Sequence, residues 1–127
     1  MDSNAALIRL KEFQIDGQRR KIAQIQIMIA EFERLAADLD REIQAEERRS
    51  GNRNPTHFAY STYAKAARQR RDNLKRSTEE LELQRDAARR TLAEAIEDLD
   101  AMSAAHSTVT DAMRAGGQNR SDLTRAS

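Results

Sequence analysis

The sequence is constrained most strongly by two heptad repeats of apolar residues, one in each half of the chain. The first repeat is formed by Ile8, Ile15, Ile22, Ile25, Ile29, Phe32, Ala36, Leu39 and Ile43. The second is formed by Tyr60, Ala64, Ala67, Leu74, Thr78, Leu81, Ala88, Leu92, Ala95 and Leu99. Apolar spacing that averages about 3.5 residues is typical of helices that bury a narrow stripe against each other. We therefore expect an all-α fold, an antiparallel two-helix coiled-coil hairpin, with these two apolar stripes face to face.

Local signals set the expected ends of the first helix and the tip. The first helix is predicted over residues 3–49, because Gly51 suits the left-handed turn that ends many helices. Asn54 and Pro55 suit the start of the second helix, since Asn caps helices and Pro is accepted in a first turn. The tip of the hairpin is therefore expected over residues 50–55.

The second helix is predicted over residues 55–115. Gly116-Gly117 should end it, because glycine is a poor helix former. Residues 116–127 are polar and lack a repeat, which predicts a disordered tail. The expected organisation is one hairpin domain over residues 1–115 followed by this tail.

The two apolar stripes also suggest how the helices are aligned. A register that places Ile8 opposite Ala95 and Ile43 opposite Tyr60 sets large residues against small ones along much of the stripe. Registers one heptad away in either direction keep the same phase, so these alternatives stay open.

Charges favour the same antiparallel arrangement. Residues 31–47 carry seven acidic and two basic side chains, net −5, and residues 65–76 carry six basic and one acidic, net +5. Opposite charges beside an apolar stripe fix orientation in coiled coils. The basic run, with Arg68 and Arg71, is interpreted first as the matching face of the hairpin, second as a contact for an acidic protein partner, and last as a nucleic-acid site.

Four polar residues interrupt the apolar line, namely Lys11, Gln18, Arg71 and Arg85. Long polar side chains can bury their stems and keep their polar ends in water. The alternative is that they lower stability and thereby specify the register or leave the hairpin adaptable.

Composition excludes several classes of protein. The chain has 127 residues, of which 39% are hydrophobic and 34% charged, with no Trp and no Cys. These values suit an elongated helical protein better than a thick globular core, and they exclude disulfides and thiolate metal sites. The net charge of +1 is too small to indicate general nucleic-acid binding. No apolar run is long enough to span a membrane, so a cytoplasmic protein is expected.

No catalytic, cofactor or metal site is expected. His57 and His106 are far apart on the hairpin, and neither has a second ligand at helical spacing. The sequence contains no phosphate-binding loop or nucleophile elbow, and a slender hairpin offers no buried environment to tune a carboxylate for acid–base chemistry. The chain is predicted not to be an enzyme.

Two groups of residues are candidates for contact with a partner. Phe58, Tyr60 and Tyr63 cluster near the tip, where they either cap the end of the apolar stripe or anchor a partner, and Tyr63 is the better anchor because it lies off the stripe. In the register above, Met102 faces Met1, and the second helix outlasts the first beyond this point. His106, Val109 and Met113 then continue the stripe without a helix opposite them. Such a stripe suits a partner, self-association or fraying.

Two segments resemble a known family. Leu10-Lys11-Glu12-Phe13-Gln14-Ile15-Asp16, followed by Arg19-Arg20-Lys21, resembles the start of FliJ-type flagellar export proteins. His57-Phe58-Ala59-Tyr60 through Arg70-Arg71-Asp72-Asn73-Leu74 resembles the second helix in the alphaproteobacterial branch of that family. The resemblance covers roughly Leu7 to Leu99, and the segment at His57 is its most specific part.

The resemblance implies a component of the flagellar type III protein export apparatus, which supports motility. Members of the family are stalk-like coiled coils that bind the hexameric export ATPase, promote its activity, contact the export gate protein and are linked to export chaperones. By this analogy the terminal end, with Ile8, Leu92, Leu99 and Met102, is expected to enter the ATPase ring. The tip side, with Tyr60 and Tyr63, is expected to meet the gate. The implied location is cytoplasmic, at the base of the flagellum, with peripheral association only.

A second class of function competes with this one. A generic structural coiled coil would self-associate through the overhanging end of the second helix, and a nucleic-acid-binding hairpin is a weaker third alternative.

Overall fold

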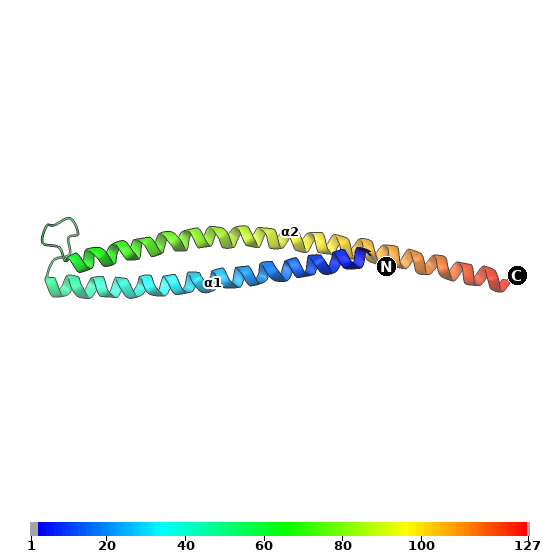
Figure 1. Ribbon diagram of the computed structural model, residues 1–127, viewed down its shortest axis with the longest axis horizontal. Coiled ribbons are helices and arrows are strands. Elements are labelled where there is room, and N and C mark those ends of the chain that lie inside the picture. The colour runs from blue at the N-terminus through cyan, green and yellow to red at the C-terminus, as the bar shows by residue number, and fades with distance from the viewer. Residues whose placement is uncertain (1–2, 127) are drawn as a thin grey trace. The chain divides into compact units, whose positions relative to one another are not determined.

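The computed structural model describes residues 3–126, with side chains for residues 3–117, as two α-helices. Helix α1 spans Ser3–Ser50 and α2 spans Thr62–Ala126, and a loop over residues 51–61 joins them (Figure 1). No strand occurs in these described residues. The predicted all-α helical hairpin is confirmed.

The chain comprises two compact units, each containing a stretch of both helices. The tip unit is Lys21–Ala88 and includes the loop. The terminal unit combines Met1–Arg20 with Arg89–Ser127.

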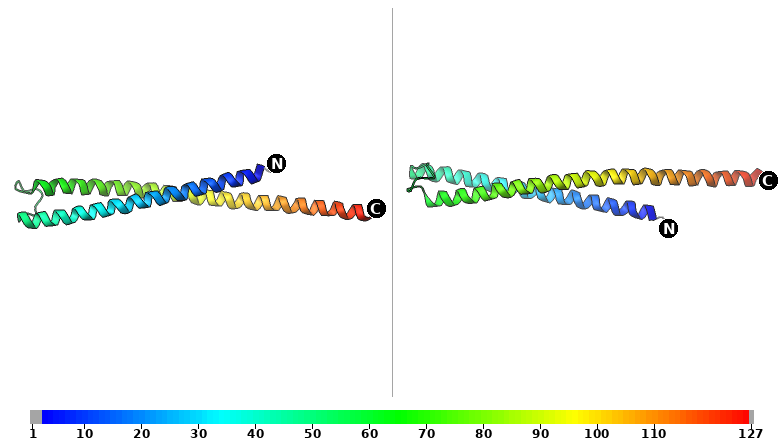
Figure 2. Two further views of the ribbon diagram at one scale, coloured as in Figure 1. Left: turned by 60° about the horizontal axis from the view of Figure 1, so that its bottom comes forward. Right: turned by 90° about the horizontal axis from the view of Figure 1, so that it is seen from above.

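Within the tip unit the two helices are antiparallel. Tyr60, just before α2, contacts Glu47 near the end of α1, with 3.1 Å between the hydroxyl and carboxylate oxygens. Farther along α2, Arg71 contacts Asp40, which lies earlier in α1, at 2.9 Å. Figure 2 shows from two further sides that the loop joins neighbouring ends of the helices. Residues later in α2 therefore meet residues earlier in α1.

The predicted apolar stripes form the core. Among the described side chains, every buried residue belongs to one of the two stripes. The buried residues are Ile15, Ile25, Ile29, Ala36, Leu39, Ile43, Tyr60, Ala64, Ala67, Thr78, Leu81, Ala88 and Ala95. The remaining stripe residues are half-buried. Burial of one aliphatic side chain contributes roughly 1.5–3 kcal/mol, so this row of contacts is the main source of stability.

Thr78 is the one polar residue in this core, and its hydroxyl is satisfied locally. The Thr78 hydroxyl donates to the backbone carbonyl oxygen of Leu74, one turn earlier, at 2.9 Å. Threonine can therefore occupy a buried stripe position without leaving an unpaired polar group.

The predicted register is wrong by one heptad. It placed Ile43 opposite Tyr60, but Ile43 packs with Leu39 and Ala67. Toward the other end of the tip unit, Ile29 packs in a cluster with Leu81. These contacts fit the alternative register one heptad farther along α2.

A longer loop explains this shift. The second helix begins at Thr62 and not near residue 55, so the loop takes up about one heptad more of the chain than expected. Since the stripes repeat by heptads, the shift keeps the same apolar residues in the core. The terminal unit fits the same shift, because Lys11 lies 3.5 Å from Asp98 although the predicted register placed it opposite Leu92.

The predicted start of the second helix is wrong because Asn54 and Pro55 form a turn of the loop and do not begin a helix. Asn54 does cap, but it closes a turn: its side-chain oxygen accepts from the Thr56 amide at 3.1 Å, and its carbonyl oxygen accepts from the His57 amide at 3.1 Å. Pro55 occupies the second position of this turn, which its fixed backbone angle favours as strongly as a first helical turn. Ser61 caps α2 instead, because its hydroxyl accepts from the amide of Ala64 at 3.2 Å.

The end of α1 follows the prediction. Gly51 has a φ angle of 73°, and its amide donates to the carbonyl oxygen of Glu47 at 2.9 Å. This is the left-handed cap that glycine favours because it has no Cβ.

The end of α2 differs from the predicted boundary at Ala115. The helix continues through Gly116 and Gly117 to Ala126, and neither glycine has a positive φ angle. Glycine weakens a helix by about 1 kcal/mol but can adopt helical angles, so two glycines need not end it. The side chains of residues 118–127 lie outside the described residues, and the disorder of the tail stays a prediction.

Over their described residues, neither helix contains a segment that is both long and apolar enough to cross a lipid bilayer.

Two isoleucines of α1 provide a matched test of this core. Ile43 is 2% exposed and Ile27 is 69% exposed. We expect Ile43→Ala to lower the free energy of unfolding by about 2–5 kcal/mol, because it leaves a cavity between the helices. Ile27→Ala should change it by less than about 0.5 kcal/mol. Urea denaturation followed by circular dichroism measures both, and equal effects would contradict the assigned core.

Candidate functional site

The tip loop presents an aromatic side chain to solvent. Phe58 is 95% exposed and stacks on the ring of His57, with ring centroids 4.6 Å apart. The loop is held by its own hydrogen bonds, since the Nδ1 atom of His57 accepts from the Ala59 amide at 3.0 Å and lies 3.1 Å from the side-chain nitrogen of Asn52. One of the two interpretations expected Phe58 to cap the apolar stripe, and it does not. Phe58 lies in the loop, where it is fixed in place and available for contact.

Tyr60, in contrast, is buried between the helices at the loop end of the stripe. It is buried, its hydroxyl donates to the Glu47 carboxylate at 3.1 Å, and it accepts a hydrogen bond from Arg68 at 3.1 Å. Arg68 also lies 4.0 Å from Glu47. Tyr60, Glu47 and Arg68 thus cover the end of the apolar stripe next to the loop. This favours a structural role for Tyr60 and Arg68 over partner contact.

Tyr63 is exposed, as the sequence suggested, but its hydroxyl is engaged. It donates to the carboxylate of Glu42 across the hairpin at 3.1 Å. This hydrogen bond, and next the negative charge of Glu42, raise the pKa of Tyr63. The ring remains free for contact while the hydroxyl ties α2 to α1.

Arg71 supports the interpretation of a charge-matched hairpin. Its side chain is half-buried and lies 2.9 Å from Asp40 on α1 and 3.1 Å from Asp72 on α2. The hydrogen bond with Asp40 raises the pKa of the Arg71 guanidinium. Of the polar residues on the apolar line, Lys11 likewise pairs across the helices, with Asp98. Gln18 differs, because its buried side-chain oxygen has no hydrogen-bond partner among the residues that the structure describes.

In the terminal unit, the predicted contact residues take part in packing. Ile8, Leu92, Leu99 and Met102 are all half-buried. Each of these side chains is partly covered by the opposite helix, so only part of its surface is exposed for contact with a partner.

The exposed continuation of the stripe begins later than expected. His106 is also half-buried, whereas Val109 is 46% exposed and Met113 is 74% exposed. The shift of register by one heptad explains this, because it moves the start of α1 to the level of later residues in α2.

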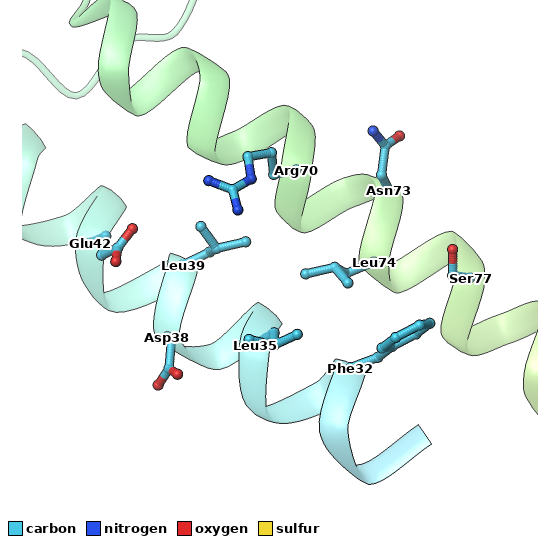
Figure 3. A pocket seen from close by; sticks show the side chains of 9 residues that line it. All are labelled: Phe32, Leu35, Asp38, Leu39, Glu42, Arg70, Asn73, Leu74 and Ser77. Atoms are coloured by element: carbon cyan, nitrogen blue, oxygen red, sulfur yellow. The ribbon is translucent and has the colours of Figure 1, made fainter. Parts of the chain in front are cut away.

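A groove on one face of the tip unit was missed in the sequence. Figure 3 shows Leu39 of α1 and Leu74 of α2 pointing toward each other, with Leu35 and Phe32 on the same side of α1. The groove has a volume of about 450 Å³. Its edges are polar and are formed by Asp38, Glu42, Arg70, Asn73 and Ser77.

One signal could have revealed the groove. Leu35 lies off the apolar stripe, and Met28 occupies the same position one heptad earlier. The two residues add a third apolar column to α1 in this region. A search for the two-column pattern of a coiled coil passes over such a column.

Comparisons with family models, with curated proteins and with solved structures find no match to this chain. In the described residues, no group of three or more His, Asp or Glu side chains is arranged to hold a metal ion. The class that the structure defines is a two-helix coiled-coil hairpin, and its particular function is a matter of proposal.

The hydroxyl of Tyr63 gives a pH-dependent test of the tip unit. The chain has two tyrosines, so in Tyr60→Phe the absorbance of tyrosinate reports Tyr63 alone. We expect its midpoint above the ordinary value of about 10, and closer to that value when Glu42→Gln is added. Because the folded pKa is raised, this contact stabilises the fold fully below the ordinary pKa, and its contribution is lost as the pH rises through the folded pKa.

Circular dichroism at each pH shows whether both variants remain folded. Identical midpoints with and without the Glu42 carboxylate would contradict the contact.

Proposed function

We propose that this chain is a coiled-coil stalk and adaptor of flagellar type III export. In this role it binds the export ATPase hexamer, promotes its activity and links it to the export gate protein and to export chaperones, at the cytoplasmic face of the flagellar base. The proposal rests on the helical hairpin and on the resemblance of the segments at Leu10 and His57 to FliJ-type proteins.

One observation carries the proposal furthest. The segment with the most specific resemblance, His57-Phe58-Ala59-Tyr60, lies in the tip loop, which presents Phe58 to solvent in a hydrogen-bonded setting. An exposed aromatic residue on a braced loop loses little conformational entropy on binding, which is typical of a contact anchor. We assign Phe58 and Tyr63 to the gate-facing surface, and Tyr60, Arg68 and Arg71 to the support of that surface.

The terminal unit supplies the second contact of the proposal. Ile8, Leu92, Leu99 and Met102 are assigned to the part that enters the ATPase ring, by analogy with the family. Residues at this end are apolar but only partly covered by their own hairpin, which suits an interface.

A second candidate function is a scaffold that self-associates. It is favoured by the exposed apolar side chains of Val109 and Met113, which continue the stripe on α2. If this candidate is correct, the chain sediments as an oligomer at micromolar concentration. Val109→Asp together with Met113→Asp should then make it monomeric.

ATP hydrolysis by the export ATPase of the same genome tests the first candidate. We expect the full chain to stimulate hydrolysis at fixed ATPase concentration. Leu99→Asp should lower the apparent affinity for the ATPase at least tenfold, because it places a charge in the apolar contact. Leu83→Asp is the matched control on an exposed position of the tip unit, and it should stimulate normally. Absence of both stimulation and co-elution would reject the stalk function.

Phe58 provides a separate test at the other contact. We expect Phe58→Ala to weaken binding to the export gate protein by at least tenfold, measured by calorimetry, with an unchanged free energy of unfolding because the side chain is exposed. Phe13→Ala, at an exposed position of the terminal unit, is the control and should bind the gate normally. Unchanged binding by Phe58→Ala would remove the tip from the proposed interface.

A further inference from the structure

We propose that the groove of the tip unit is a docking site for a single amphipathic helix of another protein, with basic residues along one edge. The groove is lined by Phe32, Leu35 and Leu39 of α1 and by Leu74 of α2 (Figure 3). This inference concerns the face of the hairpin and is independent of the export function proposed for its ends.

The number of apolar columns on α1 indicates a third helix. A helix that contacts one neighbour needs two apolar columns per heptad, whereas a helix that contacts two neighbours needs a third. Met28 and Leu35 supply this third column beside the stripe. Within the hairpin they have too little to pack against: Met28 is 45% exposed, and Leu35 is only half-buried.

The opposite face of the same unit has a different character. There the surface between the helices is lined by the small side chains of Ala36, Ala37 and Thr78 and by charged residues such as Glu33 and Lys75. The additional apolar column is thus confined to one face, as expected if one face alone receives a partner.

The width of the apolar floor favours one helix over a second copy of the hairpin. Leu74 is the one apolar residue that α2 contributes to the lining, where it is accompanied by Arg70, Asn73 and Ser77. A second hairpin packed face to face would bury these polar side chains in a new core, which costs free energy unless each finds a partner. A single helix can lie on the apolar column of α1 and leave them in water.

The charges at the edges define the chemistry of the partner. Asp38 and Glu42 line the edge on α1, and Arg70 lines the edge on α2. Asp38 pairs with Arg34 and Arg41 on its own helix, and Glu42 accepts a hydrogen bond from Tyr63. A carboxylate has about four acceptor positions, so both can accept a further hydrogen bond from a partner. A helix with apolar residues at a spacing of three and four, and with lysine or arginine along the flank next to Asp38 and Glu42, complements this pattern.

Two synthetic peptides of about 20 residues test the proposal. Both carry a leucine stripe at helical spacing and glutamine on one flank, and the other flank is lysine in the first peptide and glutamate in the second. Fluorescence anisotropy of labelled peptide with the full chain measures binding. We expect the lysine peptide to bind at least tenfold more tightly than the glutamate peptide.

Charge reversal of the groove should invert this preference. In the double variant Asp38→Lys and Glu42→Lys both edges are basic, so the lysine peptide should lose at least tenfold in affinity and the glutamate peptide should gain. An unchanged order of affinities, or no binding of the lysine peptide to the wild-type chain at about 100 μM, would overturn the proposal.

Variants in the apolar column separate docking from general stickiness. Leu35→Glu should abolish peptide binding. Met28→Glu should do so too, and because Met28 is more exposed, this variant does not risk unfolding the hairpin. Circular dichroism shows whether both variants remain folded. Leu83→Glu is the matched control at an exposed position outside the groove, and equal loss there would overturn the proposal. Sedimentation velocity adds one further outcome: a dimer that Met28→Glu dissociates would identify a second copy as the occupant and refute a separate partner.

Discussion

The packing of two apolar stripes against each other is the interaction on which this structure depends. A hairpin of two helices has no second layer to cover its core, so each stripe residue contributes directly to stability and few are surplus. Near the loop, small residues of α2 such as Ala64 and Ala67 allow close approach, and larger residues such as Ile43 fill the space opposite. A polar group in this core can be satisfied by a local partner, as the hydroxyl of Thr78 is.

The heptad pattern was sufficient to predict the core but not the alignment of its two halves. Every buried residue could be assigned from the sequence, because burial follows from the repeat alone. The register depends in addition on the length of the loop, and Asn54 and Pro55 favour a turn and a helix start about equally. The turn at Asn54 and the cap at Ser61 decided between these alternatives, and they moved the pairing by one heptad.

The candidate contact residues were harder to predict for a related reason. Phe58 and Tyr60 are two residues apart, and the predicted second helix placed both in its first turns, near the end of the stripe. The turns of the loop separate them, so that Tyr60 is buried against Glu47 and Phe58 is exposed. The groove was not predicted because Met28 and Leu35 do not belong to the two columns of the stripe. They can be recognised as a third apolar column only after the two stripe columns have been assigned.

This separation of roles suggests how a slender hairpin can serve several partners at once. The buried residues of the stripe hold the helices together, so contacts with other proteins must come from residues outside the stripe and from stripe residues that stay partly exposed, such as Leu74 and Leu99. The loop provides an aromatic residue held by turns, and the groove provides a third apolar column with charged edges. Because these two surfaces do not share side chains, a substitution in one should leave the other intact, which is the expected behaviour of distant, independent sites. A hairpin built in this way can change its partners through the loop and the third column while its core stays the same.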